Sequence, residues 1–331
     1  MRRFLGSLAA AGLLAGAASA GSITVANSNI EMSGAVTAGY FYVTNEGAGN
    51  NNDYFTVSNF SVGLKSKDKG TIGFVSYFGS NTWDGLLGRT TNKFKVKYAW
   101  VSINPVEGLT VDAGLLTTNI GYELYHSYDN LNYTFGMVWN AQPVTYPGAR
   151  VTYSVAEGID VYAEYNQDGT YGQSDSLAIG SIGSVGGIDY AVSYYDGNAT
   201  QNLIDVVLGY SLAGMDVGLN LDYHWKDDAT KTAGQDDTAY GIAIYLNPAV
   251  AANITVPVRL EYVNQGTSGI YGGIGDSAYS VTVTPTYKPT DNTYVRCEIA
   301  YVSTDAKAFA DDKGNPKDNK TFIGFEAGFL F

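Results

Sequence analysis

Hydrophobic and polar residues alternate with a period of two along most of this chain. The alternation is clear in residues 94–100, 151–155, 159–165, 217–225, 295–301 and 323–329. Because successive side chains of a β-strand point to opposite faces, each segment would have one apolar face and one polar face. We therefore expect a β-protein whose strands separate an apolar environment from a hydrated one.

The pattern predicts sixteen strands, an even number that suits a single-chain bacterial barrel. The predicted strands are residues 29–44, 54–66, 70–79, 92–104, 109–115, 147–155, 158–166, 175–183, 187–195, 202–212, 215–226, 238–247, 254–264, 277–287, 292–303 and 320–331. Short connections alternate with long ones, including a long loop at residues 80–91, as expected for tight turns at one end and loops at the other. The expected fold is all-β: a transmembrane, antiparallel, up-and-down barrel.

A soluble β-sandwich would also alternate, but the aromatic residues favour a membrane barrel. Tyr98 and Trp100 lie near a strand end and are assigned to the apolar face, where amphipathic rings meet lipid headgroups. The chain closes on a strand in which Phe325, Phe329 and Phe331 share one face. Outer-membrane barrels have a C-terminal strand of this kind.

The composition narrows the possible functions. Charged residues make up 15% of the chain, below the ~25% of an ordinary soluble domain, and glycine (40) and tyrosine (27) are abundant. A net charge of −13 argues against a nucleic-acid partner. One cysteine rules out a disulfide framework and a CxxC-type zinc site, and two histidines leave little for a histidine-rich metal centre or a histidine-based triad. No GxSxG or HExxH motif occurs. We expect no cofactor, no metal and no enzymatic activity.

The first twenty residues have the features of a secretory signal peptide. Arg2 and Arg3 precede an apolar stretch at residues 4–17, and Ala18-Ser19-Ala20 form a small-residue cleavage site. Residues 21–331 would then be the outer-membrane barrel; an uncleaved N-terminal helix is the alternative. Those residues contain no further run of ~18 apolar residues that could form a spanning helix.

The strand number and the third loop together predict a pore. At ~16 strands a barrel keeps an aqueous interior. The third loop, residues 116–146, is the longest and is rich in tyrosine and apolar side chains that could pack against a wall. We expect it to fold into the lumen and narrow it; an external lid or an extra hairpin is the alternative.

Two segments around this loop resemble a known family. Residues 114–123 (GLLTTNIGYE) and 147–153 (PGARVTY) are similar to the OmpL-like putative β-barrel porins, and the layout of the whole chain resembles Gram-negative porins generally. The resemblance implies a passive diffusion channel in the outer membrane. It implies no particular solute.

Strand parity and the loop give the candidate pore residues. The candidates for the constriction are Tyr122, Glu123, Asp129, Lys93, Lys95, Lys97, Asp112 and Arg150. The candidates for the lumen wall are Asp160, Glu164, Arg259, Glu261, Arg296 and Glu298. Opposed charges in a wide pore bias which ions enter, and here acids outnumber bases. We expect Arg150 and the lysines to lie across from the loop acids, and a weak preference for cations.

The sequence thus predicts an outer-membrane diffusion channel for small hydrophilic solutes and ions. A substrate-specific sugar or peptide channel, a plugged structural barrel and an outer-membrane hydrolase are the alternatives. The expected partners are membrane lipid and small solutes. Porins of this size are often homotrimers, but the sequence leaves trimer and monomer open.

Overall fold

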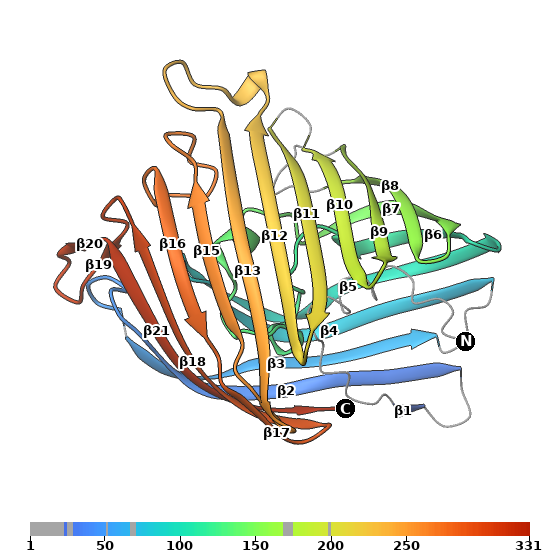
Figure 1. Ribbon diagram of the computed structural model, residues 1–331, viewed down its shortest axis with the longest axis horizontal. Coiled ribbons are helices and arrows are strands. Elements are labelled where there is room, and N and C mark those ends of the chain that lie inside the picture. Colours follow the sequence, from blue (N-terminus) through green and yellow to red (C-terminus); the bar gives the residue numbers. More distant parts are fainter. Residues whose placement is uncertain (1–22, 25–28, 51, 67–70, 168–174, 198–199) are drawn as a thin grey trace.

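A closed antiparallel β-sheet dominates the structure. The computed structural model describes residues 23–24, 29–50, 52–66, 71–167, 175–197 and 200–331. Each wall strand pairs with its neighbours along the chain, and the last strand pairs with the first. Figure 1 shows the blue N-terminal strands beside the red C-terminal strands, where the ring closes. The signal peptide predicted at residues 1–20 lies outside the described residues.

The wall strands are β2 (Ile30–Val43), β3 (Asp53–Ser66), β4 (Ile72–Asp84), β5 (Arg89–Val106), β6 (Leu109–Thr117), β7 (Thr145–Ala156), β8 (Ile159–Asn166), β9 (Ser176–Val185), β10 (Ile188–Asp196), β11 (Gln201–Leu212), β12 (Met215–Lys226), β13 (Thr238–Ala251), β14 (Ile254–Thr255), β15 (Val258–Asn264), β16 (Ser277–Val283), β17 (Thr286–Thr290), β18 (Thr293–Thr304) and β21 (Asn319–Leu330). β14 and β15 share one position in the ring, as do β16 and β17, so the barrel has 16 strand positions. The predicted sixteen-stranded all-β barrel is confirmed.

The remaining elements are short. β1 (Ile23–Thr24) pairs with β2, and β19 (Phe309–Ala310) pairs with β20 (Pro316–Lys317) in a small separate sheet. The helices are α2 (Met137–Asn140) and the 3-10 turns η1 (Ser127–Asp129) and η2 (Asp228–Thr230). In the described part of the chain, no helix has the length and hydropathy needed to cross a bilayer.

Proline residues interrupt two wall strands. Pro257 separates β14 from β15, and Pro285 separates β16 from β17. Proline has no backbone N–H to donate to the ladder, so pairing breaks at these points. The backbone N–H of Thr284 still donates to the carbonyl of Pro257, at 2.8 Å, and keeps the two broken strands together.

One predicted long loop is much shorter in the structure. Residues 80–91 were expected to form a loop, but β4 continues to Asp84 and β5 begins at Arg89. The two strand ends pair with each other from Asn81↔Asn92 to Asp84↔Arg89. Most side chains in these strand ends are polar on both faces, so the alternation that marks a half-buried strand is missing there.

The two faces of the wall differ as the alternation predicts. Large apolar side chains are exposed on the outer face, among them Val101, Tyr153, Ile179, Ile204, Tyr240, Ile299 and Phe325. Their neighbours on the inner face include buried charged and amide side chains, such as Arg259, Glu298 and Asn220. An apolar exterior around a charged interior is the arrangement of a membrane-spanning barrel.

A β-bulge on β5 reverses this alternation at one place. Tyr98 pairs with Tyr77 and Val96 pairs with Phe78, so Lys97 is an extra residue on β5. Lys97 and Tyr98 are therefore both buried on the inner face, as is Trp100. The prediction that Tyr98 and Trp100 face lipid was wrong, because the bulge shifts the parity of every residue that follows it.

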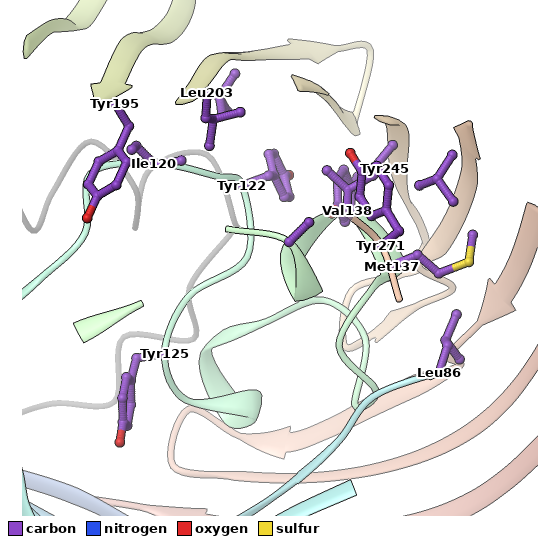
Figure 2. Close-up of a cluster of buried hydrophobic side chains, with 14 of the residues drawn as sticks. Leu86, Ile120, Tyr122, Tyr125, Met137, Val138, Tyr195, Leu203, Tyr245 and Tyr271 are labelled. Carbon is purple, nitrogen blue, oxygen red and sulfur yellow. The ribbon is translucent and has the colours of Figure 1, made fainter. Parts of the chain in front are cut away.

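The interior is also less hydrophilic than strand parity suggested. Small and apolar side chains of β9 to β11 are buried inside, namely Ala178, Ile182, Ala191, Leu203 and Val207. They belong to one apolar cluster that includes side chains of the segment between β6 and β7. Figure 2 shows Tyr122 and Val138 from that segment close to Tyr245 of β13.

Candidate pore constriction

The segment between β6 and β7, residues 118–144, is bound to the inner face of the wall through both its backbone and its side chains. The backbone N–H of Gly121 donates to Asp205 at 3.0 Å, and that of Tyr122 donates to Asn220 at 3.1 Å. The N–H of Thr134 donates to Glu298 at 2.8 Å, and that of Val138 donates to Glu261 at 3.1 Å. Inward-facing carboxylates and amides thus satisfy backbone groups of a segment that has little secondary structure of its own.

The same segment also contacts the opposite part of the ring. On β3, Asn59 donates to the Ser127 hydroxyl at 2.8 Å, and the hydroxyls of Ser61 and Tyr128 are 2.7 Å apart. On β4, the indole N–H of Trp83 donates to the carbonyl of Tyr125 at 3.1 Å. β12, which binds the other end of the segment, lies at least seven of the sixteen strand positions from β3 and β4 in either direction. The segment therefore touches walls on opposite sides.

Arg259 of β15 is the centre of one ion-pair network. Its guanidinium donates to the Glu123 carboxylate and to the carbonyl of Thr134, and its Nε lies 3.2 Å from the Glu261 carboxylate. Arg259 and Glu123 are both buried. One wall arginine thus fixes two points of the segment at once.

Two further wall arginines repeat this arrangement. Arg296 pairs with Glu326 (Nε to Oε2, 2.7 Å) and also donates to the carbonyls of Ser127 at 3.1 Å and Asn130 at 3.3 Å. Arg150 pairs with Glu164 (Nε to Oε2, 2.6 Å) and donates to the Asn119 side chain at 3.1 Å. Each arginine therefore neutralises a wall carboxylate and binds a carbonyl oxygen of the segment or its edge.

The structure pairs several predicted residues differently from the expectation. Glu123 binds Arg259 rather than Arg150, whose carboxylate partner is Glu164. Asp112 lies opposite Arg150 in the register and accepts a hydrogen bond from Ser102 at 2.5 Å. The Ser154 hydroxyl donates to Asp160 at 2.6 Å, and Asp160 takes no part in the Arg150–Glu164 ion pair.

The three lysines of β5 form a row on one face. Lys93 and Lys95 are exposed and alternate with Phe94 (62% exposed) and Val96 (54% exposed), which face outward. Lys97 is buried in the bulge, and its ammonium donates to the Asn81 side chain. The structure therefore does not bring the lysines against Glu123.

Sequence reasoning missed the amides that connect the segment to β11 and β12. Asp205 and Asp222 face each other in the register of these strands, which brings two carboxylates together. Gln142 donates to both oxygens of Asp222, at 3.0 and 2.9 Å, and Asn220 lies between the acids. Asn220 shares the inner face of β12 with Asp222, but no sequence signal connects Gln142 with either residue.

Burial changes the protonation of several groups in the segment. It raises the pKa of Asp129 to about 7, with the Arg296 guanidinium acting in the opposite direction. It also raises the pKa of Glu123, against the attraction of Arg259. It lowers the pKa of His126 to about 3, so this imidazole is neutral at physiological pH.

Comparisons with solved structures support the fold. The outer membrane channel DcaP of Acinetobacter baumannii superposes with a TM-score of 0.64 at 11% identity, covering 91% of this chain and 97% of that chain. An anion-selective porin from Comamonas acidovorans gives 0.65 at 11% identity, covering 91% and 99%. Salmonella typhi OmpF in complex with daunomycin gives 0.65 at 12% identity, covering 94% and 100%.

The family assignment comes from the sequence itself. No curated protein matches the chain. The model of the family described as putative beta-barrel porin-2, OmpL-like, matches residues 29–331, nearly the whole described chain. This confirms the resemblance seen around the third loop. The chain belongs to this OmpL-like porin family and is a porin of the bacterial outer membrane.

Proposed function

We propose that the protein is a passive diffusion channel for small hydrophilic solutes and ions, with a weak preference for cations. The observation that carries this proposal is the binding of residues 118–144 to opposite walls, through Asn59 and Ser61 on one side and Asn220 and Glu261 on the other. A segment held in this way would cross the interior and form the constriction. Tyr122, Glu123 and Asp129 would then line or support the narrowest passage.

The charge balance supports the cation preference. The three wall arginines are already paired with Glu164, with Glu123 and Glu261, and with Glu326. Arg259 is shared by two carboxylates, and among the residues that the structure describes Glu298 accepts hydrogen bonds from uncharged donors without an ion pair. The interior therefore retains negative charge, which favours cations over anions. The exposed Lys93 and Lys95 oppose this and keep the preference weak.

Planar-bilayer recordings with the purified protein test this proposal. Step-like conductance in a KCl gradient should give a small reversal potential of the sign produced by K⁺ permeation. Clear anion preference would refute the predicted charge balance without refuting the channel. The anion-selective porin from Comamonas acidovorans has the same fold, so the fold alone does not fix the sign.

The dense packing of the segment favours a second candidate, a barrel that is closed at rest. Arg259, Tyr133, Tyr245 and Phe41 are almost fully buried, although they belong to the inner wall or to residues 118–144. A closed barrel would show no step conductance in bilayers. Opening transients at higher voltage would distinguish a gated channel from a permanently plugged one.

A homotrimer is our proposal for the assembly. One of the similar solved structures is a trimer form of OmpT, an outer membrane protein of Vibrio cholerae. The mass of the purified protein in detergent, measured by light scattering, tests it. A mass of one chain after correction for detergent would contradict the trimer.

A further inference from the structure

A cavity of about 80 Å³ lies between the start of residues 118–144, the η1 region and the inner face of β5. Its lining includes rings, carboxyl groups and an amide, contributed by Tyr98, Asn119, Glu123, Tyr125, His126, Asp129 and Trp139. Asp129 and Trp139 are partly exposed, so the cavity has a connection to solvent. A water needs about 10–15 Å³ in such a space, so the cavity has room for about five to eight non-hydrogen atoms.

Four of the lining residues carry aromatic rings, namely Tyr98, Tyr125, His126 and Trp139. The rings of Tyr98 and Tyr125 are 5.4 Å apart at 78°, and those of Tyr125 and His126 are 4.9 Å apart at 77°. These rings pack edge to face against one another, so the cavity borders an aromatic cluster. A cation is attracted to the face of an aromatic ring, so a small cavity beside such a cluster suits an organic cation.

Above about pH 7, where Asp129 is ionised, its carboxylate gives the cavity a negative charge. Within the described ranges, no side chain forms an ion pair with Asp129 at 4.0 Å or less. Arg296 attracts Asp129 from a greater distance and directs its guanidinium to Glu326 and to the carbonyls of Ser127 and Asn130. Glu123, the other acid of the lining, is balanced by Arg259. His126 is buried and adds no positive charge, since burial holds its pKa at about 3.

Two buried polar atoms of the lining have no partner in the described structure. They are Nδ1 of His126 and Nδ2 of Asn119, in side chains that are 2% and 9% exposed. A buried polar atom without a partner is costly, and a bound ligand or ordered water removes the cost. The Asn119 amide suits a hydroxyl oxygen of a ligand, and the imidazole nitrogen suits another polar atom.

We propose that this cavity is a binding subsite for small organic ammonium compounds, such as a hydroxyalkyl ammonium ion. The cationic head would lie among the rings of Tyr98 and Tyr125 beside the Asp129 carboxylate, and the hydroxyl would reach the Asn119 amide. An anion would be repelled by Asp129, and a hexose exceeds the available volume. The inference deepens the proposed channel function by naming a solute class, and it rests on that function for its role in transport, although binding itself does not require conduction.

Titration calorimetry on the detergent-solubilised full chain tests the proposal. Choline at pH 8 is the probe, because Asp129 is then ionised, and 3,3-dimethylbutan-1-ol is its neutral analogue of nearly equal shape. Choline should bind saturably and the neutral analogue at least about tenfold more weakly, as expected when a cation–π and ion-pair contribution is lost. Equal binding of the two compounds, or no binding of choline, would overturn the proposal.

Matched variants locate the site. Asp129→Asn should weaken choline binding about tenfold, whereas Asp312→Asn, the same change at an exposed external residue, should leave it unchanged. Tyr125→Phe keeps the ring and should bind like the parent protein, while Tyr125→Leu should bind several-fold more weakly. Each variant is first checked for the heat-modifiable gel mobility of a folded barrel. An Asp129→Asn variant that is folded and binds choline like the parent protein would refute the site.

Bilayer recordings separate this inference from the channel proposal. If the protein conducts and choline interrupts the current in Asp129-dependent events, both are supported. If choline binds in calorimetry but no conductance occurs, the channel proposal fails and the subsite stands. If the protein conducts K⁺ and choline binds nowhere, the subsite fails and the channel stands.

Discussion

The rings of Tyr122 and Tyr245 stack with their centroids 3.9 Å apart and their planes 17° from parallel. Tyr122 belongs to the segment at residues 118–144, and Tyr245 lies on the inner face of β13. Gly218 of β12 lies next to this pair, and a Cβ atom added there would overlap the ring of Tyr122. The ring of Tyr122 therefore fits into a slot in the wall. Gly218 leaves room for the ring because it has no side chain, and the ring of Tyr245 stacks on it from the other side.

Filling this slot should release the segment. Gly218→Val should displace Tyr122 from Tyr245 and destabilise the docked segment by about 1–3 kcal/mol, the usual cost of overpacking a buried site. We expect larger and noisier conductance steps in bilayers and faster cleavage of the segment by protease. Gly273→Val is the control, because a Cβ at Gly273 meets nothing within 4 Å. Unchanged conductance and protease resistance in Gly218→Val would show that the segment is not held by this slot.

The Arg259–Glu123 pair should be the strongest single attachment of the segment. Arg259→Met leaves the buried Glu123 and Glu261 carboxylates without their cation, and loss of one partner of a buried pair costs about 3–5 kcal/mol. Urea unfolding in detergent should show this loss, and Lys95→Met, at an exposed position, should stay within about 0.5 kcal/mol of the parent protein.

A double-mutant cycle isolates the pair. Combining Arg259→Met with Glu123→Gln should recover part of the loss, because the second change removes one of the stranded charges. Strict additivity of the two changes would mean that Glu123 and Arg259 do not depend on each other, contrary to the structure.

Ion selectivity should depend on pH near neutrality. Burial raises the pKa of Asp129 to about 7, so its negative charge is present above that pH and is lost as the pH falls through it. The cation preference should therefore decrease between pH 8 and pH 6, as measured by reversal potentials. Buried Glu123 also has a raised pKa and acts in the same direction, with Arg259 opposing the shift. His126 does not contribute, because its pKa is lowered to about 3.

The Asp129→Asn variant identifies the titrating group. It should show a weaker cation preference at pH 8 and a smaller change between pH 8 and pH 6. Asp312→Asn removes the same charge from an exposed position and should keep the full pH response. A full response in Asp129→Asn would assign the titration to another acid, with Glu123→Gln as the next variant.

The wall of the barrel could be predicted from sequence because the alternation of apolar and polar residues within each strand shows which side chains share a face. Ile299 and Phe325 follow the alternation and are exposed on the outer face. Tyr98 does not, because the bulge at Lys97 depends on how β5 pairs with β4. A single extra residue opposite a neighbouring strand leaves no mark in the local hydrophobic pattern.

The partners of the third loop could not be predicted for a different reason. Glu123 and Arg259 are 136 residues apart in sequence. Their contact depends on how far each strand is shifted along the barrel axis and on the path of residues 118–144. Arg259 and Glu261 are both buried, and strand parity carries no information about how far along the barrel axis each of them lies. The structure was therefore needed to pair these charges.

The apolar outer face should contact lipid, and Ile299 of β18 offers a sharp test. Its side chain is 59% exposed near the middle of a strand of 12 residues, and it lies directly across from Ile323 of β21. An arginine near the bilayer midplane costs about 2–4 kcal/mol in a barrel wall, falling towards zero near the interfaces. Ile299→Arg should lower the unfolding free energy in lipid vesicles by this amount, while Ile299→Leu should cost less than about 1.5 kcal/mol. In detergent micelles the arginine can reach water more easily, so the penalty should shrink there. An equal penalty in vesicles and micelles would mean that Ile299 packs against protein, such as a second copy of the chain, rather than against lipid.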